Sequence, residues 1–309
     1  MPRPSHLVRH CCAATATAVV ALAAQAAEQP SSRTYSAEVG VGAEYDSNVS
    51  IDELDVSSSE SDHAWILDAE FKLEQQLGAT ADLTLTYDFS QANYAEFSIV
   101  DRQTHLVGAD LGADLGKANG GLTLYYINAR LDGEAFLEYY RGSPYLSGFL
   151  AKKWFARGAY VYSDKRIEQN PGRDAESHAG EFDLYFFRRG LRSYFNVGFK
   201  YKDEDAVQAR YDHTSSNLKL RYIHRFDLWD DVLKMELSWR YEDRDYSSNT
   251  PSIGEKRNDE RHRWKIDLEY PFMDKGAFQL YAGYADYASN YPLADYDQHV
   301  IGTRLSWRW

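Results

Sequence analysis

The chain has 309 residues, with 47 acidic and 34 basic side chains, which gives a formal net charge of −13. This acidic balance disfavours a nucleic-acid partner, because phosphate backbones are bound by Lys and Arg. The mean hydropathy is −0.58. Because no apolar run after residue 27 is long enough to cross a bilayer as a helix, transmembrane helices are excluded.

The first 26 residues are predicted to be a secretory signal peptide. Arg3 and Arg9 precede an apolar stretch from Cys11 to Ala24, and the small residues up to Ala26 suit a cleavage site. Both cysteines of the chain lie in this segment, so the mature protein is expected to have no disulfide and no reactive thiol. No small residue precedes the cysteine pair, so a lipid anchor is not expected.

After the leader, the sequence repeats runs of apolar and polar residues in strict alternation. One face of the run 232–241 carries Leu233, Met235, Leu237, Trp239 and Tyr241, and the other carries Lys234, Glu236, Ser238 and Arg240. Side chains alternate sides along a strand. These runs reach the roughly 9 to 11 residues that a tilted strand needs to cross a bilayer, whereas strands of soluble sheets average five or six. The pattern therefore predicts an all-β fold, an antiparallel transmembrane β-barrel.

We expect about fourteen strands in one barrel domain spanning residues 27–309, although two fewer would also fit. The expected strands are 34–46, 64–76, 81–94, 103–115, 121–131, 143–152, 154–166, 178–188, 193–203, 214–226, 232–245, 259–272, 277–288 and 296–309. An even number lets both termini lie on the periplasmic side of a bacterial outer membrane. The connections 47–62, 166–177 and 246–258 are long and polar and are expected outside the cell, with short turns in the periplasm.

Acidic residues fall on the predicted inward face of the first four strands, where they form an acidic wall. This wall consists of Glu38, Glu44, Asp68, Glu70, Glu74, Asp82, Asp88, Asp110 and Asp114. The seam between the first and last strands is expected to bring Glu38 and Glu44 near Arg304 and Arg308. Such a wall would favour cations or hydroxylated solutes.

Basic residues recur at inward positions of the later strands. They are Lys200, Lys202, Lys219, Arg221, Lys234, Arg240, Arg261, Arg263, Lys265, Arg304 and Arg308. Two interpretations are open. The opposed walls create a field across a polar lumen that orients charged solutes, or the groups pair as salt bridges that satisfy the interior.

The sequence predicts neither a metal site nor a cofactor, nor an enzyme. No two of the histidines after the leader stand at the spacing of metal ligands. His213, Ser215 and Ser216 are the residue types of a hydrolase, but such combinations are common in loop-rich chains. The acidic segment 52–62 lacks the spacing and the glycine of a calcium loop, and it is interpreted as a solvated external loop.

Short motifs carry a family resemblance. Gly42-Ala43-Glu44-Tyr45-Asp46-Ser47-Asn48-Val49 resembles the opening G-x-x-Y-D-S-N-V of several outer-membrane barrel families, and 257–259, 287–290 and 295–297 add similar pieces. The chain resembles β-barrel porins of exopolysaccharide loci and the barrel domain of surface lipoprotein assembly modifiers (Slam). Slam proteins typically carry a periplasmic repeat domain before the barrel, which is not seen ahead of Tyr35, so the resemblance favours the porins.

The sequence leads to a first hypothesis, an outer-membrane channel for small hydrophilic solutes or saccharide. The alternatives are a Slam-like barrel for protein translocation or assembly, and a closed structural or enzymatic barrel. Expected partners are outer-membrane lipids, lipopolysaccharide and the barrel insertion machinery, while a periplasmic or surface protein partner is left open. Whether the lumen is open or plugged by an inward loop is also left open.

Overall fold

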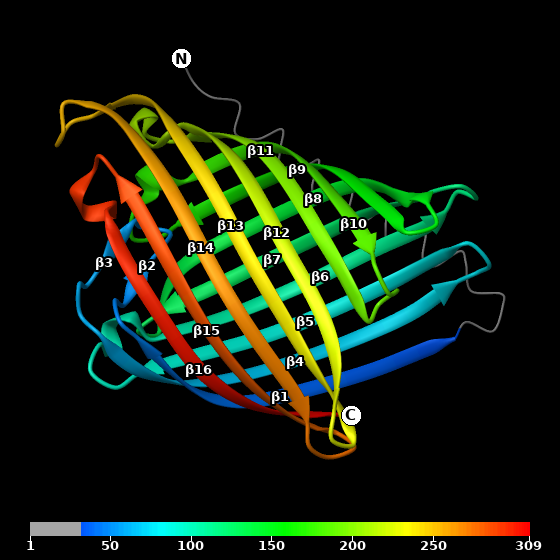
Figure 1. Cartoon of the computed structure of the whole chain (residues 1–309). Coiled ribbons are helices and arrows are strands. Elements are labelled where there is room, and N and C mark those ends of the chain that lie inside the picture. The colour runs from blue at the N-terminus through cyan, green and yellow to red at the C-terminus, as the bar shows by residue number, and fades with distance from the viewer. Residues whose placement is uncertain (1–31) are drawn as a thin grey trace.

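The computed structural model describes residues 32–309. Fourteen antiparallel strands close into one barrel, which confirms the predicted fold class (Figure 1). The signal-peptide prediction, including Cys11 and Cys12, lies outside the described residues. In the part of the chain from 32 onward, no helix is long and apolar enough to cross a membrane.

The barrel strands follow one another in chain order, and β1 closes the sheet by pairing with β16. They are β1 (Arg33–Asp46), β4 (Asp62–Leu77), β5 (Ala81–Tyr94), β6 (Arg102–Asp114), β7 (Asn119–Leu131), β8 (Glu134–Ala151), β9 (Trp154–Ile167), β10 (Ala175–Phe187), β11 (Ser193–Ala206), β12 (His213–Leu228), β13 (Asp231–Thr250), β14 (Glu255–Pro271), β15 (Gly276–Ser289) and β16 (Tyr296–Arg308).

The outer face of the barrel is apolar and carries aromatic rings toward both ends. Large side chains such as Val41, Trp65 and Phe182 are exposed on it. Near the end with the longer connections, histidines lie against outward tyrosines in the pairs Tyr45–His63, Tyr87–His105, Tyr160–His178 and Tyr284–His299. At the opposite end the outward ring pairs are Tyr35–Phe71, Trp154–Phe186 and Trp229–Tyr270. Aromatic girdles at two levels are typical of barrels that cross a bilayer.

The connections differ in character between the two ends, which we call the loop end and the turn end. At the loop end, on the left in Figure 1, four connections contain a short 3-10 helix: η1 (Ser98–Val100), η2 (Pro171–Arg173), η3 (Ala209–Tyr211) and η4 (Pro292–Ala294). An aspartate follows each of these turns. Asp101, Asp174 and Asp212 accept hydrogen bonds at 2.7–2.8 Å from backbone N–H groups of the preceding strand, which fixes each loop against its own hairpin.

The prediction of a connection between the expected strands 121–131 and 143–152 is wrong, because β8 already begins at Glu134. Asp132 and Gly133 form a tight hairpin in which both residues have positive φ, at 49° and 76°. Asp-Gly is the typical sequence of such a turn. The register between β7 and β8 shifts by one residue beside Ala129. The consecutive residues Phe136 and Leu137 of β8 are therefore both buried, which breaks the alternation of apolar and polar residues there.

The strands also extend into two of the other expected long loops. β13 and β14 shorten the connection predicted at 246–258, and β9 and β10 shorten the one predicted at 166–177. The connection after β1 remains long, but it is not a solvated external loop. It forms a small hairpin of β2 (Ser50–Ile51) and β3 (Val56–Ser57) that folds into the barrel at the loop end.

The apolar residues of this first loop hold it inside the barrel. Ile51 and Leu54 pack against a buried cluster on β7, β8 and β9. The cluster consists of Ala129, Leu131, Phe136, Leu137 and Ile167, of which Phe136 and Ile167 are fully buried. Full burial of one aliphatic side chain contributes about 1.5–3 kcal/mol. Ile51 and Leu54 are partly buried, so their contacts favour an inward loop by a part of that amount.

The hairpin at Asp132 and Gly133 leads to a prediction about stability. Gly133→Ala is expected to lower the free energy of unfolding by about 1 kcal/mol, because a side chain is strained at positive φ. Urea titration of the folded barrel in detergent, followed by tryptophan fluorescence, measures the change. Gly158→Ala is the matched control, since a methyl group at Gly158 meets no atom within 4 Å. Equal losses in both variants would contradict the account of this turn.

Candidate functional site

The register of the sheet places the nine predicted acids on one continuous inner face. The register of β1, β4, β5 and β6 places them all on the same side of the sheet: Glu38, Glu44, Asp68, Glu70, Glu74, Asp82, Asp88, Asp110 and Asp114. Glu38, Glu70 and Asp88 stand directly beside one another across three strands. Like charges in such positions destabilise a sheet, so this row must be offset by water, by solute or by the opposite wall.

The predicted bases lie on the inner face of the other strands. Lys200, Lys202, Lys219, Arg221, Lys234, Arg240, Arg261, Arg263, Lys265, Arg304 and Arg308 belong to β11–β14 and β16. Many are paired with carboxylates, as in Lys219–Asp183 at 2.7 Å and Lys234–Glu269 at 3.1 Å. Lys219, Arg240 and Arg263 nevertheless form a row of three cations across neighbouring strands. Ion pairs and a row of adjacent like charges thus both occur on this wall.

The seam where β1 meets β16 brings acid and base together in part. Arg304 contacts Glu38 at 3.3 Å and Asp68 at 3.0 Å, and Arg308 also pairs with Glu38. Glu44 has a different partner, the hydroxyl of Tyr281 at 2.7 Å. The ion pairs close the barrel at its turn end, and the Tyr281 contact bridges the acidic wall to β15.

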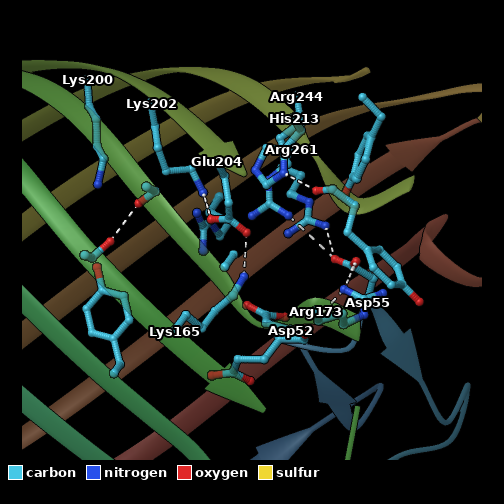
Figure 2. A pocket seen from close by; sticks show the side chains of 18 residues that line it. Asp52, Asp55, Lys165, Arg173, Lys200, Lys202, Glu204, His213, Arg244 and Arg261 are labelled. Carbon is cyan, nitrogen blue, oxygen red and sulfur yellow. Dashed lines mark hydrogen bonds and ion pairs between the residues drawn. The ribbon is translucent and has the colours of Figure 1, made fainter. Parts of the chain in front are cut away.

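The first loop carries the residue with the densest electrostatic environment, Asp55. Its carboxylate accepts hydrogen bonds from Arg261 at 2.6 Å and Arg173 at 2.7 Å, and Arg244 lies 3.6 Å away (Figure 2). Arg257 donates a third hydrogen bond at 3.1 Å. Burial alone would raise the pKa of Asp55, but the four guanidinium groups hold it well below its usual range. Asp55 is therefore ionised, and it ties the loop to η2, β13 and β14.

Further contacts tie the loop to other parts of the barrel wall. Arg173 also donates to the backbone carbonyls of Glu53 and Leu54. Glu53 pairs with Arg102 of β6 at 2.5 Å, and Asp52 accepts from the hydroxyl of Tyr296 of β16 at 3.3 Å. The loop thus has contacts on several sides of the lumen and narrows it at the loop end.

A cavity of about 250 Å³ lies beside this loop (Figure 2). Seven cationic and four carboxylate side chains line it: Lys165, Arg173, Lys200, Lys202, Arg244, Arg261 and Arg263 against Asp52, Glu53, Asp55 and Glu204. Glu204 is shared by Lys165 at 2.6 Å and Lys202 at 2.8 Å. The cavity is therefore an electropositive part of an otherwise acidic protein.

A wider cavity of about 430 Å³ lies between the two walls. Glu44, Asp68, Glu70 and Asp88 line one side, and Lys265, Gln279, Tyr281 and Arg304 line another. The interior of the barrel is thus not filled by its own side chains in this region. The charged and polar side chains of this lining are suited to water and polar solutes.

Within residues 32–309, His213 and Ser215 have hydrogen-bond partners other than each other. The Nδ1 atom of His213 bonds to the carbonyl of Tyr211 at 3.0 Å, while the hydroxyl of Ser215 accepts from Asn217. Over residues 32–309, no group of three or more His, Cys, Asp or Glu side chains is placed to hold a metal ion.

Sequence reasoning missed the residues that hold the first loop where it narrows the lumen. The most important of them are Asp55, Arg173, Arg244 and Arg257. In the sequence, Asp55 is one of several acids in a polar segment. The available signal was the presence of Ile51, Leu54 and Val56 among those acids, since a fully solvated loop has no need of such apolar residues.

No family model matches this sequence, and no curated protein matches it. Among solved structures, the barrel is similar to an anion-selective porin from Comamonas acidovorans, with a TM-score of 0.52 and 8% identity over 91% of this chain and 100% of the porin. It is also similar to OmpT, an outer membrane protein of Vibrio cholerae, with a TM-score of 0.50 and 7% identity over 91% of this chain and 100% of OmpT. The fold is that of outer-membrane β-barrels. At such low identities the likeness concerns the fold alone.

The network around Asp55 leads to a second prediction. Asp55→Asn is expected to weaken the docking of the first loop by about 3–5 kcal/mol, because several buried guanidinium groups lose their shared counter-charge. Limited proteolysis of the folded barrel is expected to cut within 47–61 faster than in the wild type. Asp52→Asn is the control, because Asp52 accepts from tyrosine hydroxyls. Unchanged proteolysis of Asp55→Asn, or a larger effect at Asp52, would contradict the assigned role.

Proposed function

We propose that the protein is an outer-membrane channel for small hydrophilic solutes. The observation that carries this proposal is the cavity of about 430 Å³ between the acidic wall and Lys265 and Arg304, inside a closed barrel. Side chains leave room for water there, and opposed charges give the interior a transverse field that orients dipolar solutes. The similar barrel from Comamonas acidovorans is an anion-selective porin, which is consistent with a channel on this fold.

The outer surface supports a location in the bacterial outer membrane. An apolar face with aromatic rings toward both ends fits a bilayer with two polar interfaces. Ile301 and Leu305 of β16 are exposed on this face. Lipids and lipopolysaccharide would surround the barrel, and the barrel insertion machinery would be its assembly partner.

A saccharide is a second class of solute that the interior suits. A group of aromatic rings stands at inward register positions near the turn end of β8–β11: Phe149, Phe155, Tyr185, Phe187 and Tyr194. The rings contact one another, with centroid separations of 5.3 Å for Phe149–Phe155 and 5.7 Å for Phe187–Tyr194. An amphipathic aromatic surface beside a polar lumen binds the apolar faces of sugar rings.

Single-channel recording tests the channel proposal. Refolded protein in planar bilayers is expected to give discrete current steps. The double variant Glu70→Gln with Asp88→Asn is expected to shift the reversal potential in a salt gradient toward anions, because it removes two charges from the acidic wall. The matched control is Glu176→Gln with Asp205→Asn, a pair that faces away from the lumen on neighbouring strands.

Two results would contradict the channel. One is a folded barrel that gives no current steps. The other is an equal shift of the reversal potential in the control pair. A silent barrel that co-purifies with a lipoprotein client would support the Slam-like alternative instead.

A further inference from the structure

The cavity beside the first loop has properties that the channel alone does not require. It contains more positive than negative side chains although the whole chain is acidic. Its carboxylates are already engaged: Asp55 by three arginines and Glu204 by two lysines. Carboxylates behind the lining offset this excess of positive charge only in part, since Glu181 contacts Lys200 and Glu242 contacts Arg244.

Several of these cations have hydrogen-bond donors to spare. Lys200 contacts Glu181 at 3.2 Å, and Lys202 contacts Glu204 at 2.8 Å. A lysine ammonium group has three N–H donors. The guanidinium of Arg263 approaches Glu242 only to 3.6 Å, and its buried Nε atom has no acceptor within the described part of the chain. Carboxylates and phosphates are the groups that such donors bind best.

A buried histidine adds a different kind of contact. His213 lines the cavity and is 4% exposed. Its Nδ1 atom lies 3.0 Å from the carbonyl oxygen of Tyr211, which can only accept, so Nδ1 carries the proton. The Nε2 atom is left as a buried acceptor, and among residues 32–309 it has no hydrogen-bond partner. A buried acceptor without a donor is costly, and a ligand hydroxyl would satisfy it.

We propose that this cavity is a binding site for a small hydroxylated carboxylate, such as a sugar acid. The carboxylate is bound by Lys200, Lys202 and Arg263, and a hydroxyl of the same molecule donates to Nε2 of His213. The proposal rests on the channel function and names a solute class for it. Because the cavity adjoins the inward loop, a bound anion would occupy the narrow part of the channel and interrupt the current.

The test compares D-glucuronate with D-glucose, which has the same ring but no carboxylate. In planar bilayers, glucuronate is expected to cause brief, concentration-dependent interruptions of the current, whereas glucose at the same concentration is not. Lys202→Gln and, as a second variant, Arg263→Gln are each expected to raise the half-blocking concentration roughly tenfold or more, the usual effect of losing one charge-assisted hydrogen bond. Lys234→Gln, an equal change of lumen charge near the turn end, is the control.

Binding is also measured without current, by calorimetric titration of glucuronate into the detergent-solubilised barrel. If the folded barrel does not conduct but still binds glucuronate, with weaker binding in Lys202→Gln, the channel proposal fails and the site stands. If the barrel conducts while glucuronate and glucose act alike, the site is wrong and the channel stands. An equal effect of Lys234→Gln would show that only the net charge of the lumen matters, and would also overturn the site.

Discussion

Closure of the sheet is the constraint on which the rest of the structure depends. A strand edge in an apolar medium leaves backbone N–H and C=O groups without partners, at a cost of several kcal/mol each. Pairing of β1 with β16 removes that edge. Once the barrel is closed, every strand has one outward and one inward set of side chains, so the charged residues of the alternating pattern share one enclosed space.

Charge inside that space is arranged in three zones. β1 and β4–β6 contribute a row of carboxylates, β11–β14 contribute paired and unpaired cations, and the first loop joins the two at the loop end. The loop is anchored in two ways, by Ile51 and Leu54 in an apolar cluster and by Asp55 among arginines. A buried ion pair costs desolvation that its Coulomb energy only partly returns, so the apolar contacts are important for keeping the loop inside.

The sequence predicted the fold, because a period of two fixes which residues share a face of a strand. The register places the predicted acids and bases at inward positions of these strands. The sequence was less informative wherever the alternation of apolar and polar residues is broken. The bulge at Phe136 hid the first part of β8, and the Asp132-Gly133 turn fell within a segment predicted as a loop.

The position of the first loop inside the lumen could not be derived from the alternation of apolar and polar residues. Asp55 and its partners Arg173 and Arg261 are separated by more than a hundred positions along the chain, and only the folded loop brings them together. For His213, which faces the same cavity, the sequence offers no signal beyond its place near Ser215 and Ser216.

The inward position of the first loop is the central claim, and it is tested most directly by cross-linking. In a background without Cys11 and Cys12, cysteines replace Glu53 and Arg102, whose side chains form an ion pair across the lumen. A short bis-thiosulfonate reagent is expected to join them in most molecules of the membrane-inserted protein, as read by mass spectrometry of the digest. Cysteines at Glu53 and Lys234 are expected to remain unlinked. Equal linkage of the two pairs, or none at Glu53 and Arg102, would show that the loop does not lie inside the barrel.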